Sequence, residues 1–131
     1  MKTMENIRSN TGKRGEQVAC RYLESIGHEI VERNWRHSHK EVDIISLSAD
    51  KVLHIVEVKS KTEPVVAEPT LSINGQKMQN LAAAARGYLR SARKIKLPTD
   101  LEVVFDVVTV VFSDRGPRIE YYPQAYIPTY A

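Results

Sequence analysis

The chain has 131 residues, with 42% hydrophobic and 27% charged residues, which suits one soluble globular domain that needs no disulfide to hold its core. The net charge of +3 and the pI of about 9.0 are compatible with a polyanionic partner but do not require one. The lone cysteine, Cys20, excludes an internal disulfide. The longest apolar stretch, near 103–112, is far shorter than the roughly 20 residues that span a bilayer. We therefore expect a cytoplasmic protein without membrane contact.

The first third of the chain predicts one helix and one short strand. Residues 1–10 are polar and are expected to be irregular. A helix is predicted over residues 12–26, because apolar positions recur there at three- and four-residue spacing and Gly27 is a common helix stop. Residues 29–33 are expected to form a short strand.

The middle of the chain predicts a β-hairpin followed by a second helix. Residues 42–47 and 52–58 are β-branched runs separated by four turn-forming residues. Residues 62–75 contain two prolines and little periodicity, so a loop is expected. Apolar positions on one side of residues 76–92 predict a helix.

The last third predicts a buried strand and an edge strand. Residues 101–112 hardly alternate between apolar and polar, which favours a strand buried on both faces. Residues 118–122 are expected at an edge, and the tail after Pro123 is expected to be irregular. The order of elements predicts an α/β fold, a mixed β-sheet flanked by helices, in one domain over residues 1–131 with a core over about 12–122.

Two carboxylates and a lysine stand inside the predicted hairpin. Glu57 and Lys59 end an apolar strand and lie two residues apart, so they share one face. Asp43 lies inside the β-branched run of the partner strand. If the turn is centred on Asp50, residues whose numbers sum to 100 oppose one another, and Asp43 faces Glu57 with Cβ atoms about 5 Å apart.

Opposed carboxylates are unfavourable unless one is protonated or a cation bridges them. Mg²⁺ or Mn²⁺ suits such a pair, because these ions take one or two carboxylates together with water and substrate phosphate. Lys59 could then orient an attacking water or stabilise charge on the phosphate. The alternative is that Glu57 and Lys59 form an ordinary surface pair on a strand.

A third acid precedes the apolar stripe of the first predicted helix. Glu16 lies three and seven residues before Ala19 and Leu23, so it flanks the buried side of that helix. Gly12 and Gly15 beside it allow a backbone or a ligand to approach closely. Glu16 is therefore either a third site carboxylate or an acid that complements the helix dipole.

These features occur together in an ordered set of short motifs that covers about residues 12–112. The motifs are Gly15-Glu16-Gln17-Val18-Ala19, Asn34-Trp35-Arg36, Glu41-Val42-Asp43-Ile44-Ile45, Glu57-Val58-Lys59-Ser60-Lys61, Lys77 and Phe105-Asp106-Val107-Val108. In these motifs the chain resembles the YraN-like family of bacterial proteins. The resemblance implies a restriction-endonuclease-like fold with the PD-(D/E)xK nuclease signature, and similarity to archaeal Holliday-junction resolvases.

The resemblance also implies roles for the site residues. Asp43 and Glu57 would bind Mg²⁺ or Mn²⁺, Lys59 would be the catalytic lysine, and Glu16 would be the additional helix acid. Two departures concern the surroundings of this site: Lys40 stands where the family commonly has glycine, and Lys61 where it often has arginine.

Candidate nucleic-acid-binding residues are Arg36, Lys61 and Lys77. Lys77 opens the second predicted helix and could contact phosphate or could simply be solvated. Trp35, next to Arg36, could shape the site mouth or stack on nucleic acid, but a half-buried tryptophan that anchors its strand is the favoured interpretation.

The remaining polar residues point less clearly to chemistry. His37 and His39 lack companion ligands for zinc. His54 is expected to pack on the strand face opposite Glu57, Asp106 lies in the most apolar strand and needs a partner, and no Ser–His–Asp constellation is expected. A basic run in and after the second helix could be a solvated face or a phosphate footprint; it comprises Arg86, Arg90, Arg93, Lys94 and Lys96.

The resulting hypothesis is a Mg²⁺-dependent endonuclease that cuts structured or branched DNA with water as the nucleophile. One alternative is a catalytically silent module that binds nucleic acid on a nuclease scaffold, and another is a protein-interaction domain without a nucleic-acid role. A homodimer would place two sites on one substrate, as resolvases require, but no feature of the sequence identifies an interface.

Overall fold

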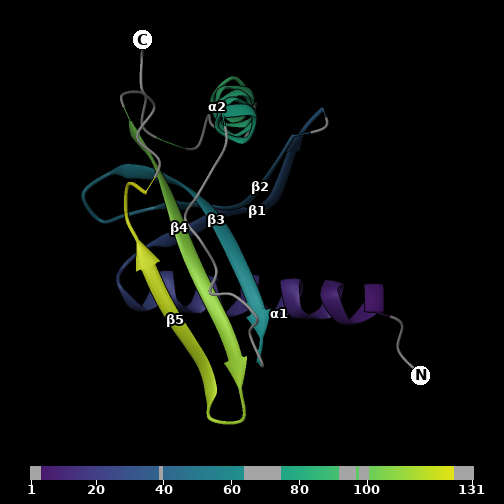
Figure 1. The fold of residues 1–131 in the computed structure, drawn as a ribbon. Coiled ribbons are helices and arrows are strands. Elements are labelled where there is room, and N and C mark those ends of the chain that lie inside the picture. Colours follow the sequence, from purple (N-terminus) through teal and green to yellow (C-terminus); the bar gives the residue numbers. More distant parts are fainter. Residues whose placement is uncertain (1–3, 39, 64–74, 92–96, 98–100, 126–131) are drawn as a thin grey trace.

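The computed structural model describes residues 4–38, 40–63, 75–91, 97 and 101–125; of residues 4–9, 77 and 78 it describes the backbone alone. A five-stranded sheet packs against two helices (Figure 1). In chain order the elements are α1 (Met4–Ser25), β1 (Glu29–His37), β2 (Lys40–Leu47), β3 (Val52–Thr62), α2 (Gly75–Leu89), β4 (Glu102–Ser113) and β5 (Gly116–Tyr122). The predicted α/β fold, a mixed sheet flanked by helices, is confirmed.

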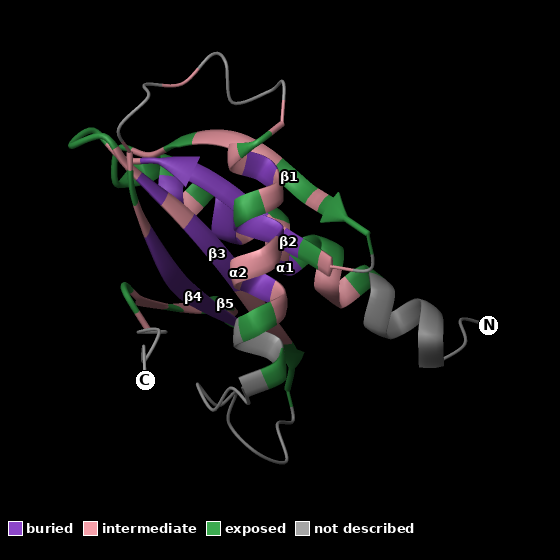
Figure 2. Ribbon diagram, turned by 90° about the horizontal axis from the view of Figure 1, so that it is seen from above, coloured by how far each residue is buried: buried purple, intermediate pink, exposed green. Residues whose placement is uncertain are grey.

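The strands lie in the order β1-β2-β3-β4-β5, and every neighbouring pair is antiparallel except β3 and β4. Parallel neighbours need a crossover connection, and α2 lies within it. β3 and β4 hold the centre of the sheet and carry most of its buried residues (Figure 2). Residues 104–112 of β4 are all buried, so the prediction of a strand covered on both faces is confirmed.

Two apolar clusters occupy the two faces of the sheet, because successive strand residues point to opposite sides. The first cluster joins α2, through residues such as Leu81 and Tyr88, to Ile55. The second joins α1, through Leu23, to Val56. The two helices therefore cover opposite faces, and neighbouring residues of β3 belong to different cores.

Helix α1 begins at Met4, so the prediction that residues 1–10 are irregular is wrong for residues 4–10. It ends in a Schellman motif at Gly27, which has a φ of 97°: the Gly27 N–H donates to Glu24 O at 3.1 Å and the His28 N–H to Leu23 O at 3.0 Å. Ile26 was expected on the buried stripe, but it lies beyond the helix and is 46% exposed, because the chain already turns there toward β1.

Several strands extend beyond the predicted bounds because their neighbours pair with them. β1 continues to His37, which pairs with Lys40, and β3 continues to Thr62, which pairs with Phe112. β5 is an edge strand, as predicted. Most of the predicted loop over 62–75 and the tail after residue 125 lie outside the described residues.

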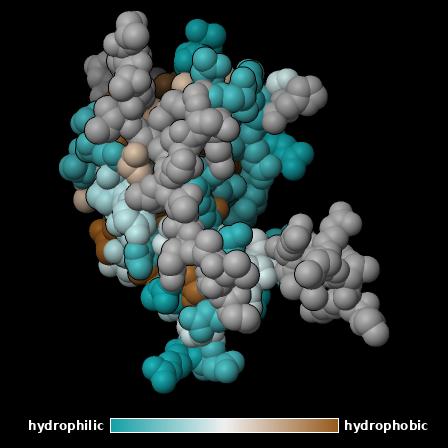
Figure 3. All heavy atoms as spheres, in the orientation of Figure 1, coloured by the Kyte–Doolittle hydropathy of each residue, from teal (hydrophilic) through white to brown (hydrophobic). Residues whose placement is uncertain are grey.

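The described surface is mostly hydrophilic on the face drawn in Figure 3, where apolar groups form only small separate patches. Among the described residues, neither helix combines the length and the apolar character that crossing a membrane requires.

Candidate active site on strands β2 and β3

The β2–β3 hairpin has the predicted register. Ile44 pairs with Val56 and Leu47 with Leu53, so opposed residues have numbers that sum to 100. The recorded pairing of the two strands ends at Ile44 and Val56. Beyond this pair the Val58 N–H donates to the Asp43 carboxylate, with 2.8 Å between Val58 N and Asp43 Oδ2. The aspartate of β2 is thereby fixed to the Glu57-Val58-Lys59 segment of β3.

Glu57 and Lys59 flank Val58, the residue that Asp43 holds. Glu57 is 8% exposed and lies among the buried residues of the sheet, where a carboxylate is normally compensated by a hydrogen bond or a cation. Lys59 is half-buried, and burial lowers the pKa of its ammonium group below the ordinary value. Both charged groups therefore lie where solvent alone cannot stabilise them fully.

Glu16 lies on α1, half-buried beside β1 and β2. With its amide nitrogen turned toward the carboxylates, Asn34 donates to Glu16 Oε2 at 3.1 Å and to Glu41 Oε1 at 3.3 Å. Burial raises the pKa of Glu16 above its ordinary value; the hydrogen bond from Asn34 and the charges of Arg33 and Lys13 oppose this effect, and Glu41 adds to it. Asn34 thus links Glu16 to Glu41, whereas the prediction from the sequence grouped Glu16 with Asp43 and Glu57.

Asn34 and Glu41 are polar neighbours of Glu16 for which no role was predicted from the sequence. Asn34 has a φ of 53°, a left-handed conformation that asparagine tolerates better than most residues. Both residues stand in motifs that the resemblance includes. The sequence signal that could have pointed to Asn34 is the presence of an asparagine among strand-forming residues.

Gly15 brings α1 against the strand that carries Glu57 and Lys59. A Cβ atom on Gly15 would lie 2.8 Å from Ser60 Cβ, closer than such atoms approach in proteins, so only glycine allows this packing distance. This contact lies on the α1 side of β3, whereas Glu57 and Lys59 alternate to the side of Ile55, which α2 covers.

The chemistry of the carboxylates fits a hard divalent ion. Within the described part of the chain no group of three His, Cys, Asp or Glu side chains is arranged to hold a metal. Asp43 and Glu57, on adjacent strands, remain the pair that suits Mg²⁺ or Mn²⁺, which need only one or two protein carboxylates.

The family model described as "Uncharacterised protein family UPF0102" matches residues 15–110. The chain belongs to this family. The resemblance to the YraN-like family is thereby confirmed.

Relatives named "UPF0102 protein" align over nearly their whole length. The one from Bacteroides thetaiotaomicron is 33% identical, with 89% of this chain and 92% of the relative covered. The one from Geobacter metallireducens is 34% identical, with 88% and 90% covered. The one from Syntrophus aciditrophicus is 35% identical, with 93% and 91% covered.

The predicted nucleic-acid contacts of this UPF0102 member lie in different surroundings. Arg36 is exposed on β1 and forms an ion pair with Glu41 at 3.4 Å. Lys61 is exposed on β3, on the same strand face as Lys59. Trp35 is half-buried and packs edge-on against Tyr88 with ring centroids 5.2 Å apart, which supports its role as an anchor. The side chain of Lys77 lies outside the described residues.

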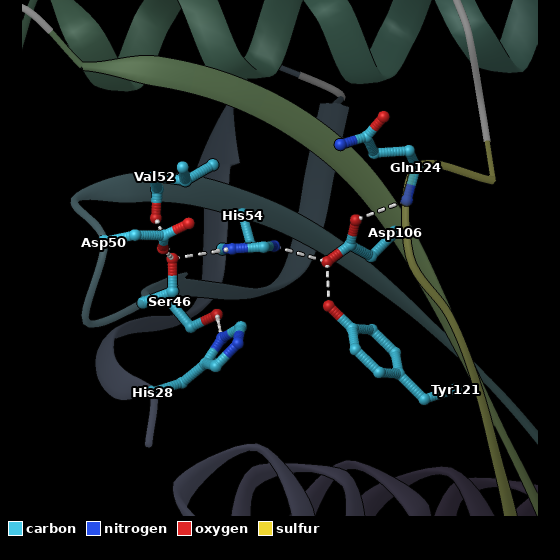
Figure 4. A network of polar contacts seen from close by, with 9 residues as sticks. His28, Ser46, Asp50, Val52, His54, Asp106, Tyr121 and Gln124 are labelled. Carbon is cyan, nitrogen blue, oxygen red and sulfur yellow. Dashed lines mark hydrogen bonds and ion pairs between the residues drawn. The ribbon is translucent and has the colours of Figure 1, made fainter. Parts of the chain in front are cut away.

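A polar network on the α1 face of the sheet supplies the partners that Asp106 was expected to need (Figure 4). His54 Nδ1 lies 2.5 Å from Asp106 Oδ2, the Tyr121 hydroxyl donates to the same oxygen, and the Gln124 N–H donates to Asp106 Oδ1 at 2.9 Å. Burial acts to raise the pKa of Asp106, but these hydrogen bonds outweigh it and hold the pKa below its ordinary value. Asp106 is thus a satisfied structural acid.

The same network contains a Ser–His–Asp chain, contrary to the prediction from the sequence. Ser48 Oγ lies 3.0 Å from His54 Nε2, and His54 leads on to Asp106. The Ser48 hydroxyl also contacts the Asp50 carboxylate and Val52 O, and the Ser48 N–H donates to Val52 O. A hydroxyl engaged by a carboxylate in a tight turn is poorly placed as a nucleophile, so this chain fixes the hairpin turn to the sheet.

Proposed function

We propose that this protein is a metal-dependent nuclease that hydrolyses phosphodiester bonds in structured or branched DNA. One observation carries the proposal: Asp43 accepts the N–H of Val58, the residue between Glu57 and Lys59. Asp43 therefore lies against the segment of β3 that carries Glu57 and Lys59, at the point where the recorded pairing of β2 and β3 ends.

Each residue has a distinct role in the proposed reaction. Asp43 and Glu57 would hold a Mg²⁺ or Mn²⁺ ion, which when bound neutralises phosphate charge and lowers the pKa of a bound water. Lys59 would orient the attacking water and stabilise charge on the phosphate. Glu16, held by Asn34, would position the neighbouring strand beside the substrate.

The lowered pKa of Lys59 supports this role. Burial brings its protonation equilibrium closer to neutral pH than that of a solvated lysine. The same burial means that the ammonium group is only partly solvated, so its interaction with a bound phosphate would be less screened by water.

Cleavage of a four-way junction and of a flap, with Mg²⁺ or Mn²⁺, tests the proposal. Wild-type protein should cut, and Glu57→Gln or Lys59→Met should slow cutting by at least about 100-fold, because each removes a group used in the transition state. Glu102→Gln, which changes an exposed acid at the start of β4, should leave the rate unchanged and serves as the matched control.

Binding measured on the same substrates separates the alternatives. Salt-dependent binding by wild type and by Glu57→Gln without cleavage by either would identify a silent nucleic-acid-binding module and would reject the hydrolytic proposal. Absence of salt-dependent binding would reject a nucleic-acid role altogether.

A further inference from the structure

A groove of about 540 Å³ lies between the end of the β1–β2 hairpin and helix α2. The hairpin lines it with Arg36, His37 and Lys40, and the helix lines it with Arg86 and Arg90. No aspartate or glutamate is among its described lining residues. Basic side chains from two separate elements therefore face one space.

The fold brings these side chains together. Arg86 lies in the last turn of α2, and Arg90 follows the helix directly, with its N–H donating to Arg86 O at 3.1 Å, so the two lie one helical turn apart. The neighbouring Tyr88 points inward and packs on Trp35, which fixes the helix over the hairpin. Gly87 leaves room for this approach, because a Cβ there would lie 2.6 Å from the ring of His37.

The arginines of the groove are available to a ligand. Arg36 pairs with Glu41 at 3.4 Å, but the two side chains are 74% and 38% exposed, and such surface pairs contribute little free energy. Within the described part of the chain, no ion pair to Arg86 or Arg90 is recorded, and both side chains are exposed. A phosphate could bind these guanidinium groups without first breaking a buried interaction.

We propose that this groove binds the phosphodiester backbone of a nucleic-acid strand and leads that strand toward Asp43, a step that rests on the proposed function. Lys40 of the groove precedes Asp43 by three residues on β2, a distance of about 10 Å at the rise of an extended strand. In Figure 1 the hairpin end lies beside α2, and in the matching view of Figure 3 hydrophilic side chains gather over that part of the molecule.

The size and lining of the groove favour a polymer over a small anion. A water molecule takes up about 30 Å³ in the liquid, so the groove of about 540 Å³ has room for a ligand much larger than a few water molecules. The aromatic ring beside it, Trp35, is engaged with Tyr88 and so is occupied by the protein core. Recognition then rests on backbone charge, and the affinity should depend little on base sequence.

The test compares two double variants that lose the same charge. Arg86→Gln with Arg90→Gln changes the groove, and Arg21→Gln with Arg115→Gln changes exposed arginines outside its lining. Fluorescence anisotropy on labelled DNA duplexes of two unrelated sequences gives the slope of log K against log salt. Because each lost phosphate contact reduces that slope by about 0.9, the groove variant should reduce it by nearly two, and the control should leave it near the wild-type value.

Lys40→Gln provides an independent variant on the hairpin side, with an expected reduction in slope of about one. Circular dichroism of all variants verifies folding. Equal salt slopes for the groove and control variants would overturn the proposal. Effective competition by polyglutamate, at the same charge concentration as the DNA, would also overturn it, because the groove would then prefer acidic protein. If wild type cleaves DNA and the groove variants bind it unchanged, only the proposal for the groove is rejected. If the groove variants lose binding but wild type does not cleave, only the proposal of hydrolysis is rejected.

Discussion

Lys59 carries an ammonium group in a half-buried position, where burial lowers its pKa. A lysine whose folded pKa lies below its unfolded value destabilises the folded state while it is protonated, and this penalty disappears as the pH rises toward the ordinary value of 10.5. Lys59→Met should therefore increase the urea midpoint at pH 7, and the gain should shrink by pH 10.

Lys61→Met is the matched control for this prediction, because Lys61 lies on the same strand but is exposed. The control should leave the midpoint unchanged at both pH values. A stability gain combined with lost activity is the pattern expected of a residue kept for function. A Lys59→Met protein less stable than wild type at pH 7 would contradict the assignment.

Asp106 has the opposite dependence on pH. Its folded pKa lies below the ordinary value of 3.8, so its contribution to stability is complete above that pH and is lost as the pH falls through the folded value. Asp106→Asn should lower the free energy of unfolding by about 1–3 kcal/mol at pH 7, because a buried hydrogen-bonding network loses a partner. Below about pH 4 the difference from wild type should shrink.

Urea denaturation between pH 2.5 and pH 7 measures this effect, with Asp114→Asn as the control in the exposed turn after β4. If the difference between Asp106→Asn and wild type stayed constant over that range, the carboxylate would not be the group whose protonation destabilises the fold.

At the level of elements, α1 contains two glycines with different surroundings. A Cβ on Gly12 meets nothing within 4 Å, so Gly12→Ala should stabilise the helix by up to about 1 kcal/mol. Gly15→Ala should destabilise the protein, because its Cβ would overlap Ser60. Thermal unfolding of both variants checks the prediction, and adding Ser60→Gly to Gly15→Ala should restore most of the loss.

Local patterns predicted the elements well because each contains its own signal. Four turn-forming residues fixed the register of the β2–β3 hairpin, and that register is the observed one. The extension of β3 to Thr62 was missed because the last residues of the strand are polar and are held by β4, 50 positions further along the chain. Ile26 was misplaced because helical periodicity does not show where a helix ends.

The site was predicted less completely because it depends on how elements meet. Alternation placed Glu57 and Lys59 on one face, but the angle between α1 and the sheet decides whether Glu16 reaches Asp43 or Glu41. The Ser48–His54–Asp106 chain joins a turn to two strands, and the partners of Asp106 are 15 to 52 positions away. No local pattern contains such contacts.

At the level of the whole molecule, the net charge of +3 conceals an uneven distribution. The fold gathers basic side chains of two elements into the groove beside α2, while acids such as Glu16 and Glu41 gather where α1 meets the hairpin. Local fields that guide charged ligands depend on such grouping and not on the total charge.

The parallel pairing of β3 with β4 has a consequence for synthesis of the chain. Val52 pairs with Glu102 and Thr62 with Phe112, so a growing polypeptide that has reached residue 63 contains β1 to β3 but leaves one hydrogen-bonding edge of β3 open. Such edges recruit strands of other molecules. A fragment of residues 1–63 should therefore form thioflavin-positive aggregates at concentrations where the complete chain stays monodisperse in light scattering, and ribosome-bound intermediates should need a chaperone until the fourth strand emerges.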